Sequence, residues 1–438
     1  MKKVVLAFIF YATLIATANA QVWSLEKCIS YAMENNLNIK QTKLSVDLAQ
    51  VDKSDRRFAM YPNLNSQASN THTYGRAINP LTNSYVPRDV NSVNLSANSN
   101  VTLFNGFQRM NNFKSSEMTL EAEKKNYEKI KNDIALNVIN NYLNVLFTQE
   151  LLAVAKEQLE VTKLQLDRAQ KNAAVGNATE GDVLNIKSQV ANDELNVTNA
   201  ENNLTIARLN LIQLLDRDPA ENFEVEKPGD IEQYLVVSSV ASLKEVYENA
   251  SSNLPDIKLL EFRYKAAQRS LAAAKGAYYP RLSLGAGLSS DYADLNPNSF
   301  NTQMKNNFGQ FYQFSLAIPV FNGLTARNNV KRANIQLQNA EINKKNAELT
   351  LSKTIQQAIA DLSAARKKYE STFRSNQSLR EAFTYSQKRF DVGLINAIDY
   401  NIAKTSLAKS SADLVQAKYE LLFRAKLLDF YNGKPLTF

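Results

Sequence analysis

The stretch V-T-L-F-N-G-F-Q-R, at residues 101–109, marks an abrupt change in the character of the chain. An alternating, strand-like run ends in Phe104-Asn105-Gly106, and a basic segment with helical character follows at once. The same event recurs as I-P-V-F-N-G-L-T-A-R at residues 318–327. Asn-Gly ordinarily joins the two strands of a hairpin, but no second strand follows either copy. We therefore read each Asn-Gly as a corner from strand to helix, where glycine accepts unusual dihedrals and asparagine caps the first turn.

The two corners belong to an internal repeat, because matched positions along the chain keep an offset of 217–218 residues. The repeat carries Tyr-Pro before the strands and Val-Gly followed six residues later by Asp, matching Tyr61-Pro62 with Tyr279-Pro280, Val175-Gly176 with Val392-Gly393, and Asp182 with Asp399. We therefore predict two structural repeats, residues 21–228 and 229–438, joined near Pro228-Gly229.

Each repeat contains the same elements in the same order: a short helix, a second helix, two strands, a very long helix and a return helix. The second helix ends at Tyr-Pro, because proline disfavours helix in the residue before it and lacks an N–H donor. The predicted strands are 63–74, 91–104, 281–290 and 311–321. The predicted helices before the return helices are 24–35, 38–60 and 107–173, then 242–251, 255–278 and 324–390. This plan predicts a mainly α fold with a small β part.

The helices 107–173 and 324–390 contain no proline or glycine, and each would extend ~100 Å at 1.5 Å per residue. A helix of that length must lie against neighbours. Small and apolar residues recur at steps of three and four, as in coiled coils, at Leu152, Ala155, Leu159, Thr162, Leu166 and Ala169, and at Leu351, Ile355, Ala358, Leu362, Ala365 and Tyr369. The final helix repeats every seven residues at Tyr400, Leu407, Leu414, Leu421 and Leu428. The sequence therefore predicts that each long helix turns at Gly176 or Gly393 and packs against its return helix.

The first twenty residues have the pattern of a secretory signal peptide, with Lys2 and Lys3 before an apolar run and Ala18-Asn19-Ala20 at its end. The apolar run is shorter than the ~20 residues that a membrane-spanning helix needs. We therefore expect export, with a mature chain that begins near Gln21. The single cysteine, Cys28, is expected to be a small buried hydrophobe on a short helix.

Basic and acidic residues are interleaved along the helices, so the formal net charge of +8 indicates solvated helix surfaces and no nucleic-acid partner. The chain has one histidine and one cysteine, so it lacks the residues for a multi-cysteine zinc set. No glycine-rich phosphate loop is present. These observations predict no enzyme activity, no cofactor and no metal site. Trp23 is expected to be a packing residue.

Each predicted strand is close to the ten residues that a tilted strand needs to cross a bilayer, although an ordinary soluble hairpin has the same period. Four strands cannot close a membrane barrel, because the smallest barrels have eight and an open edge in lipid leaves backbone groups unsatisfied. Strands in the membrane would therefore have to be pooled by several chains with cyclic symmetry, and three chains would give twelve strands. The alternative is a secreted or periplasmic coiled-coil protein or adhesin with no transport role.

The order and doubled spacing of these motifs resemble the TolC-like outer-membrane efflux proteins over essentially the whole mature chain. The resemblance implies a homotrimer in which four strands per chain form one twelve-stranded β-barrel in outer-membrane lipid. A long periplasmic α-helical barrel would extend from it. It also implies an exit duct of a tripartite efflux pump or type I secretion system, which works with a periplasmic adaptor (membrane fusion) protein and an inner-membrane pump of RND or ABC type. The cargo could be a drug, a metal or a protein.

The same resemblance implies a periplasmic gate at the tips formed by Gly176 and Gly393. Asp399 matches the upper member of a family ring of aspartates, but the lower position is Ile402. A family arginine position is Ile395, and a family tyrosine position is Phe390. Two hypotheses for the gate follow, an aspartate ring with Asp399 and Asp182, or an apolar constriction at Ile395 and Ile402. Phe104, Gly106, Phe321 and Gly323 are expected where barrel becomes tunnel.

Overall fold

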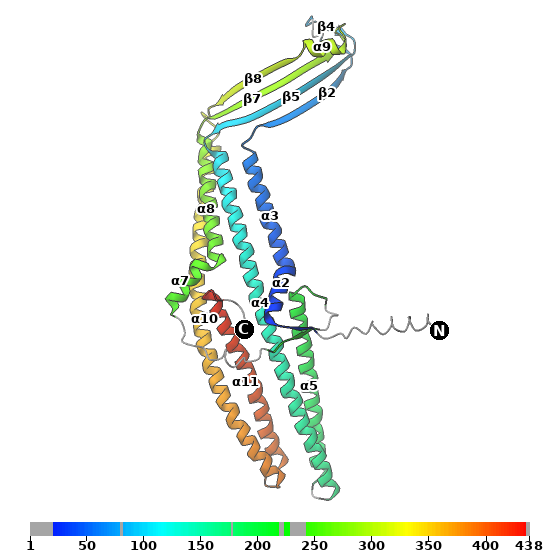
Figure 1. Cartoon of the computed structure of the whole chain (residues 1–438), viewed down its shortest axis with the longest axis vertical. Coiled ribbons are helices and arrows are strands. Elements are labelled where there is room, and N and C mark those ends of the chain that lie inside the picture. Colours follow the sequence, from blue (N-terminus) through cyan, green and yellow to red (C-terminus); the bar gives the residue numbers. More distant parts are fainter. Residues whose placement is uncertain (1–20, 79–81, 177, 219–222, 228–241, 435–438) are drawn as a thin grey trace, which may run out of the picture. The chain divides into compact units, whose positions relative to one another are not determined.

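Figure 1 shows the chain in a computed structural model, which describes all residues except 1–20, 79–81, 177, 219–222, 228–241 and 435–438. The predicted signal peptide and the junction at Pro228-Gly229 lie outside the described residues. The chain forms two compact units, and each takes segments from both sequence repeats. The coiled-coil unit comprises Met1–Lys43, Tyr127–Pro255 and Glu348–Phe438, and the strand unit comprises Leu44–Asn126 and Asp256–Ala347.

Three pairs of matched helices in the two repeats have equal lengths. They are α2 (Leu25–Asn35) and α7 (Leu243–Asn253) with 11 residues, α4 (Gln108–Ala174) and α10 (Thr325–Asp391) with 67, and α5 (Glu180–Leu214) and α11 (Ala397–Tyr431) with 35. The long helices start and end within one residue of their predicted limits. The tandem helical plan is therefore confirmed. No helix among the described residues is long and apolar enough to cross a membrane.

The coiled-coil unit contains two antiparallel helix pairs, α4 with α5 and α10 with α11 (Figure 1). Salt bridges join the members of each pair, Lys156 to Glu201 and Lys368 to Glu420. The predicted seams are buried, as Thr162, Ile355 and Leu421 show. Close packing of small and apolar residues at these seams removes them from water and supplies most of the stability of the long helices.

The main core of this unit contains a two-stranded parallel sheet that the sequence did not predict, β1 (Gln21–Trp23) with β6 (Phe223–Val225). The Tyr142 hydroxyl lies 3.1 Å from the Trp23 carbonyl oxygen and 2.5 Å from that of Glu226, so it ties both strands to α4. Trp23 packs against Tyr31 and Phe223, which confirms its expected packing role. Cys28 is fully buried on α2, and burial raises the pKa of its thiol to about 12, so the thiol is unreactive.

The strand unit contains an antiparallel sheet in the order β2-β5-β7-β8. Its strands are β2 (Asn63–Thr73), β5 (Val90–Asn105), β7 (Arg281–Ala293) and β8 (Gly309–Ala317). The strand predicted at 311–321 therefore ends four residues early. Pro319 cannot donate a ladder hydrogen bond and restricts the residue before it, so the strand does not continue through it in a single chain.

Helices of the strand unit precede and follow the sheet. α3 (Leu37–Phe58) and α8 (Pro255–Lys275) precede the strands, and the 3₁₀ turn η1 (Gly276–Tyr278) extends α8 towards Tyr-Pro as predicted. The start of α4 contacts both helices, since Lys53 pairs with Glu117 at 2.9 Å and the Ser115 hydroxyl donates to the Ala266 carbonyl at 3.0 Å. The two predicted strand-to-helix corners therefore occur in one unit.

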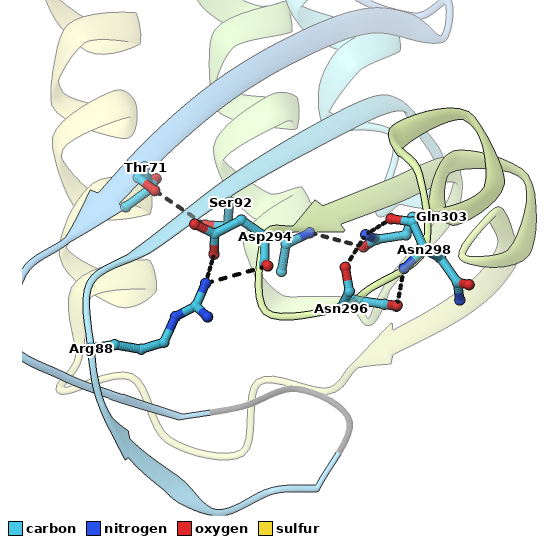
Figure 2. A network of polar contacts seen from close by, with 8 residues as sticks. Thr71, Arg88, Ser92, Asp294, Asn296, Asn298 and Gln303 are labelled. Carbon is cyan, nitrogen blue, oxygen red and sulfur yellow. Dashed lines mark hydrogen bonds and ion pairs between the residues drawn. The ribbon is translucent and has the colours of Figure 1, made fainter.

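At the other end of the sheet, two loops contain short elements that the sequence did not predict, β3 (Arg76–Ile78), β4 (Tyr85–Pro87) and α9 (Phe300–Asn306). Figure 2 shows the side chains that order these loops. The buried Gln303 amide donates to the carbonyls of Asn296 at 3.1 Å and Asn298 at 2.8 Å, and its oxygen accepts from the Ala293 N–H at 3.1 Å. Arg88 contacts Asp294 and so joins the first loop to the second.

Candidate functional site

Two turns at the end of the coiled-coil unit contain the predicted tip glycines. Gly176 and Gly393 have φ values of +80° and +75°, in the left-handed region that favours glycine. Their N–H groups donate to the carbonyls of Ala173 and Phe390, both at 3.0 Å, and so end the long helices. Val175, Val392 and Leu394 are exposed beside them. The tips thus expose apolar side chains at tight, defined turns.

The two aspartates that follow the tips occupy the same position in their helices. Asp182 forms a capping box with Thr179, and its carboxylate accepts from the Thr179 N–H at 3.2 Å and the hydroxyl at 2.8 Å. The Asn396 side chain caps α11 by accepting from the Asp399 N–H at 2.8 Å. Both carboxylates also favour the positive end of the helix dipole. Helix capping therefore accounts for Asp182, whereas the exposed Asp399 carboxylate lies on an open surface.

The first turns of α11 have two contrasting faces. Ile398 and Ile402 are exposed, and Asp399 lies beside them because residues three and four apart share a helix face. Tyr400 and Lys404 are buried on the other face. Ile395 is half-buried in the turn before the helix. Of the predicted gate residues, Asp399 and Ile402 thus lie on one exposed face, and Ile395 and Asp182 lie apart from it.

Aromatic side chains hold the end of the α10–α11 pair together. Tyr400 packs against Phe390 with ring centroids 4.8 Å apart, and against Phe383 with centroids 5.4 Å apart. Burial raises the pKa of Tyr400 to about 12, so its hydroxyl stays neutral. Phe390, which stands where family members can carry a tyrosine, therefore packs within its own helix pair and offers no polar group to another.

A crevice of about 650 Å³ separates the two helix pairs near the tips, lined by both turns and by Gln165, Arg168 and Ile186. Arg168 of α4 bridges to Asp391 of α10, with Nη1 and Oδ1 2.6 Å apart. Both side chains are more than one-third exposed, so water and salt weaken this pair. It is a surface link between the pairs.

A second link between the pairs is buried, and the sequence analysis missed it. Lys404 of α11 pairs with Asp193 of α5, with Nζ and Oδ2 2.9 Å apart, and their side chains are 2% and 4% exposed. The Lys404 ammonium also donates to the Thr162 hydroxyl of α4, and that hydroxyl contacts Asp193 Oδ2. The other Asp193 oxygen accepts from Gln189 at 2.9 Å. The available signal was a lysine four residues after the seam residue Tyr400, which places a charge on a buried face.

The predicted strand-to-helix corners have matching backbone geometry. Gly106 and Gly323 have φ values of +62° and +59°, and the residues after them are also left-handed. The side chains of Asn105 and Asn322 accept from backbone N–H groups of the first helical turns, at 3.4 and 3.5 Å. Phe104 lies opposite Leu282, and β8 ends opposite Arg281, so both corners begin at the same end of the sheet. Whether this level is the membrane boundary remains a prediction.

No group of three or more His, Cys, Asp or Glu side chains among the described residues could hold a metal ion. A chain with four strands in one sheet and two long coiled-coil pairs has the architecture of an outer-membrane exit channel.

Comparison with known proteins agrees with this architecture. The family described as outer membrane efflux protein matches residues 28–217 and 246–433. The outer membrane efflux protein BepC of Brucella suis is 21% identical over 446 residues, which cover 99% of this chain and 90% of BepC. The outer membrane protein TolC of Escherichia coli K12 is 22% identical over 422 residues, covering 92% and 80%. The Campylobacter jejuni CmeC outer membrane channel has a TM-score of 0.81 at 18% identity, covering 93% of this chain and 85% of CmeC.

The chain belongs to the outer membrane efflux protein family, because the family matches it twice and over most of its length. It is therefore an outer-membrane efflux channel with a periplasmic helical extension, of the kind that serves tripartite efflux or type I secretion systems. Members of the family are channels and not enzymes, and membership implies a homotrimer. The expected resemblance to TolC-like proteins is confirmed.

Proposed function

We propose that the exposed face of α11 lines the narrowest part of the periplasmic end of this channel. Ile398, Asp399 and Ile402 share that face, while Tyr400 and Lys404 occupy the buried face. In a threefold assembly, one carboxylate and two isoleucines per chain would form a ring that is mainly apolar, with a single layer of negative charge. This combines the two hypotheses for the gate: Asp399 selects by charge, and Ile402 narrows the path by excluding water. Ile395 would support the turn before this face.

Conductance of the purified protein in planar bilayers tests this proposal. A trivalent cation should block the wild-type channel, and Asp399→Ala should relieve the block because the ring of carboxylates is gone. Ile402→Asp should strengthen the block by adding a second ring of carboxylates. Asp182→Ala is the matched control, since that carboxylate is engaged in its own capping box. Equal block in wild type and Asp399→Ala would exclude the ring.

The internal repeat also predicts how copies join. Within the described chain, β2 pairs only with β5 and β8 only with β7, so the sheet has two open edges. The pair β5·β7 joins the first repeat to the second. We propose that β8 pairs with β2 of the next copy in the equivalent way, because the repeat relates β5 to β8 and β7 to β2. Three copies would then close twelve strands and leave no edge in lipid.

The equivalence fixes a register. Ser99 lies opposite Ala286 in the chain. Offsets of 217 and 218 residues convert this pair into Leu316 opposite Ala68 of the partner subunit. The same offsets bring Pro319 to the position of Thr102, where the β5·β7 register shifts. Proline is tolerated at such an irregularity, so pairing with a partner would allow the strand to continue beyond Ala317.

Disulfide cross-linking tests the register. Directly opposed residues of antiparallel strands lie about 4.5–5.5 Å apart at Cα, within disulfide range. Leu316→Cys with Ala68→Cys should give covalent trimers on mild oxidation, whereas Leu316→Cys with Asn70→Cys, displaced by two residues, should not. The native Cys28 is buried and does not interfere. Cross-linking of the second pair alone would contradict the proposed register, and cross-linking of neither would contradict the pairing of these edges.

We further propose that the apolar tip turns dock an adaptor protein that delivers cargo from an inner-membrane pump of RND or ABC type. Val175, Val392 and Leu394 expose most of their surface at the turns, so a partner that docks there would bury apolar area and gain stability from it. Val392→Asp with Leu394→Asp should abolish co-purification of the channel with its adaptor and leave bilayer conductance intact. Unchanged co-purification would exclude the tips as the docking site.

A further inference from the structure

The buried cluster of Lys404, Asp193 and Thr162 lies where the two helix pairs of the coiled-coil unit meet. Its members come from α11, α5 and α4 respectively, so one side chain of the second pair binds two of the first. All three side chains are at least nine-tenths buried. Gln189 completes the hydrogen bonding of Asp193. Water and salt screen this pair far less than the exposed Arg168–Asp391 link, and loss of either partner leaves the other charge buried and uncompensated.

The interactions within each pair differ from those between the pairs. Within the second pair, Tyr400 packs on Phe383 and Phe390, and the Asn376 amide donates to the Ser411 hydroxyl at 3.0 Å. These contacts hold α10 and α11 together near the tips. Between the pairs, a crevice lies near the tips, and Arg168 and Asp391, which form the surface link, both line it. The contacts within the second pair would let it move as a body once its links to the first are broken.

Farther from the tips, α11 is anchored to α4 by apolar contacts. Tyr419 and Leu422 belong to the main core of the unit, and Tyr419 meets Phe147 with ring centroids 6.4 Å apart. Lys404 lies fifteen residues from Tyr419 along α11, and Ala397 lies twenty-two, which at 1.5 Å per residue are lever arms of ~22 Å and ~33 Å. A swing about the anchor that displaced Lys404 by ~3 Å, enough to separate the ion pair, would move the start of α11 by ~5 Å.

We propose that Lys404, with Asp193 and Thr162, is the latch that holds the α10–α11 pair against the α4–α5 pair in the closed channel. The proposal rests on the proposed role of the α11 face as the constriction. The tip positions Phe390, Ile395 and Asp182 offer no polar link between the pairs, since they pack, turn the chain and cap a helix. The latch instead lies farther from the tips and is buried. Opening must separate the lysine from the carboxylate and expose both to water. The α10–α11 pair would therefore have two distinct positions, closed with the ion pair formed and open with it broken.

Single-channel conductance of the purified full-length protein in planar bilayers tests the latch. Lys404→Met preserves length and removes the charge, and should raise the mean conductance several-fold. Asp193→Asn should act in the same direction, and the double variant should conduct no more than the larger single effect, because the two residues act as a unit. Thr162→Val keeps the shape and both charges and should give a smaller rise. It decides the question alone if Lys404→Met fails to fold.

Lys368→Met is the matched control. It removes an equivalent ammonium from a 2.8 Å pair with Glu420, but that pair lies within the α10–α11 pair. It should leave conductance at the wild-type value. Wild-type conductance in both Lys404→Met and Thr162→Val channels would overturn the latch, as would fully additive effects in the double variant. Absence of any conductance in the wild type would instead contradict the proposed function, so the two failures are distinguishable.

Discussion

At the residue scale, the two corner glycines have the same backbone conformation and different surroundings. Both have positive φ. A Cβ on Gly106 would overlap the carbonyl oxygen of Gly276, whereas a Cβ on Gly323 would meet no atom within 4 Å in a single chain. The first corner therefore packs tightly against Gly276 of the same chain, whereas the second corner has free space around its glycine in a single chain.

Substitution of these glycines should separate strain from steric overlap. Gly323→Ala should cost about 1–2 kcal/mol from left-handed backbone strain in the unassembled chain. Gly106→Ala should cost more, because the overlap with Gly276 is added. Circular-dichroism melting of the refolded, unassembled chain measures both. The difference should shrink in the trimer, where the proposed pairing of copies would bring Phe58 of the partner subunit to the position equivalent to Gly276. Equal melting points in the unassembled chain would contradict the account of the first corner.

Gln303 is the residue on which the order of the second loop depends. It makes three hydrogen bonds that hold residues 293–298 around α9 (Figure 2). At about 1 kcal/mol net for each bond, Gln303→Ala should destabilise the loop by roughly 2–3 kcal/mol. Trypsin should then cut faster after the exposed Lys305. Asn301→Ala, on the exposed side of the same helix, should leave the cleavage rate unchanged, and equal rates for both variants would show that Gln303 does not order the loop.

At the scale of elements, a charge cluster ties α4 to α11 and to the segment after β6. Glu150 pairs with Lys227 at 2.8 Å and Lys418 at 3.4 Å. Burial alone would raise the pKa of Glu150, but the hydrogen bond from Lys227 and the charges of Lys418 and Lys227 outweigh it and lower the pKa below its ordinary 4.5. The ionised form is therefore favoured by folding.

This shift predicts a specific dependence on pH. Because the folded pKa is depressed, the contribution of Glu150 is present above pH 4.5 and is lost as the pH falls through the folded pKa. At neutral pH, Glu150→Gln should lower the unfolding free energy by roughly 1–2 kcal/mol. The gap between wild type and variant should close on acidification, as followed by thermal melting. A gap that stays constant with pH would mean that the charge of Glu150 contributes nothing.

The long helices show how much of the fold the sequence predicts. The limits of α4 and α10 were predictable to within a residue, because glycines flank long runs with coiled-coil spacing. The sheet of β1 with β6 was not, since three-residue strands distant in sequence carry no periodic signal. α9 was missed because its seven residues are too few to show a helical period. The end of β8 was misplaced, because a single-chain sheet has no partner for residues beyond Ala317.

The candidate site was predictable in part. The tip turns follow from Val-Gly and the helix caps that come after them. The separation of the two aspartates, one engaged in a capping box and one exposed, depends on side-chain contacts that spacing does not encode. The cluster of Lys404, Asp193 and Thr162 joins three helices whose relative rotation no local pattern specifies. Charges on predicted buried faces are the signal that could have identified it.

At the scale of the whole molecule, these elements describe a channel subunit with a packed core and, in the proposed mechanism, an end that moves. The α10–α11 pair is anchored by Tyr419 and Leu422, latched by Lys404, and ends in the face that carries Asp399 and Ile402. Breaking the latch should therefore widen the gap between the pairs at the tips and leave it unchanged at the anchor. Such a change would couple the proposed latch to the proposed constriction.

Pulsed electron spin resonance on trimers with one labelled chain measures that gap most directly. Spin labels at Val175→Cys and Leu394→Cys report the tips, and labels at Leu209→Cys and Lys367→Cys report the level of the anchor; all four positions are exposed. Introducing Lys404→Met should lengthen the tip distance by ~5 Å, by the lever-arm estimate at 1.5 Å per residue, and leave the anchor distance at its wild-type value. An unchanged tip distance, or equal lengthening at both levels, would contradict the account.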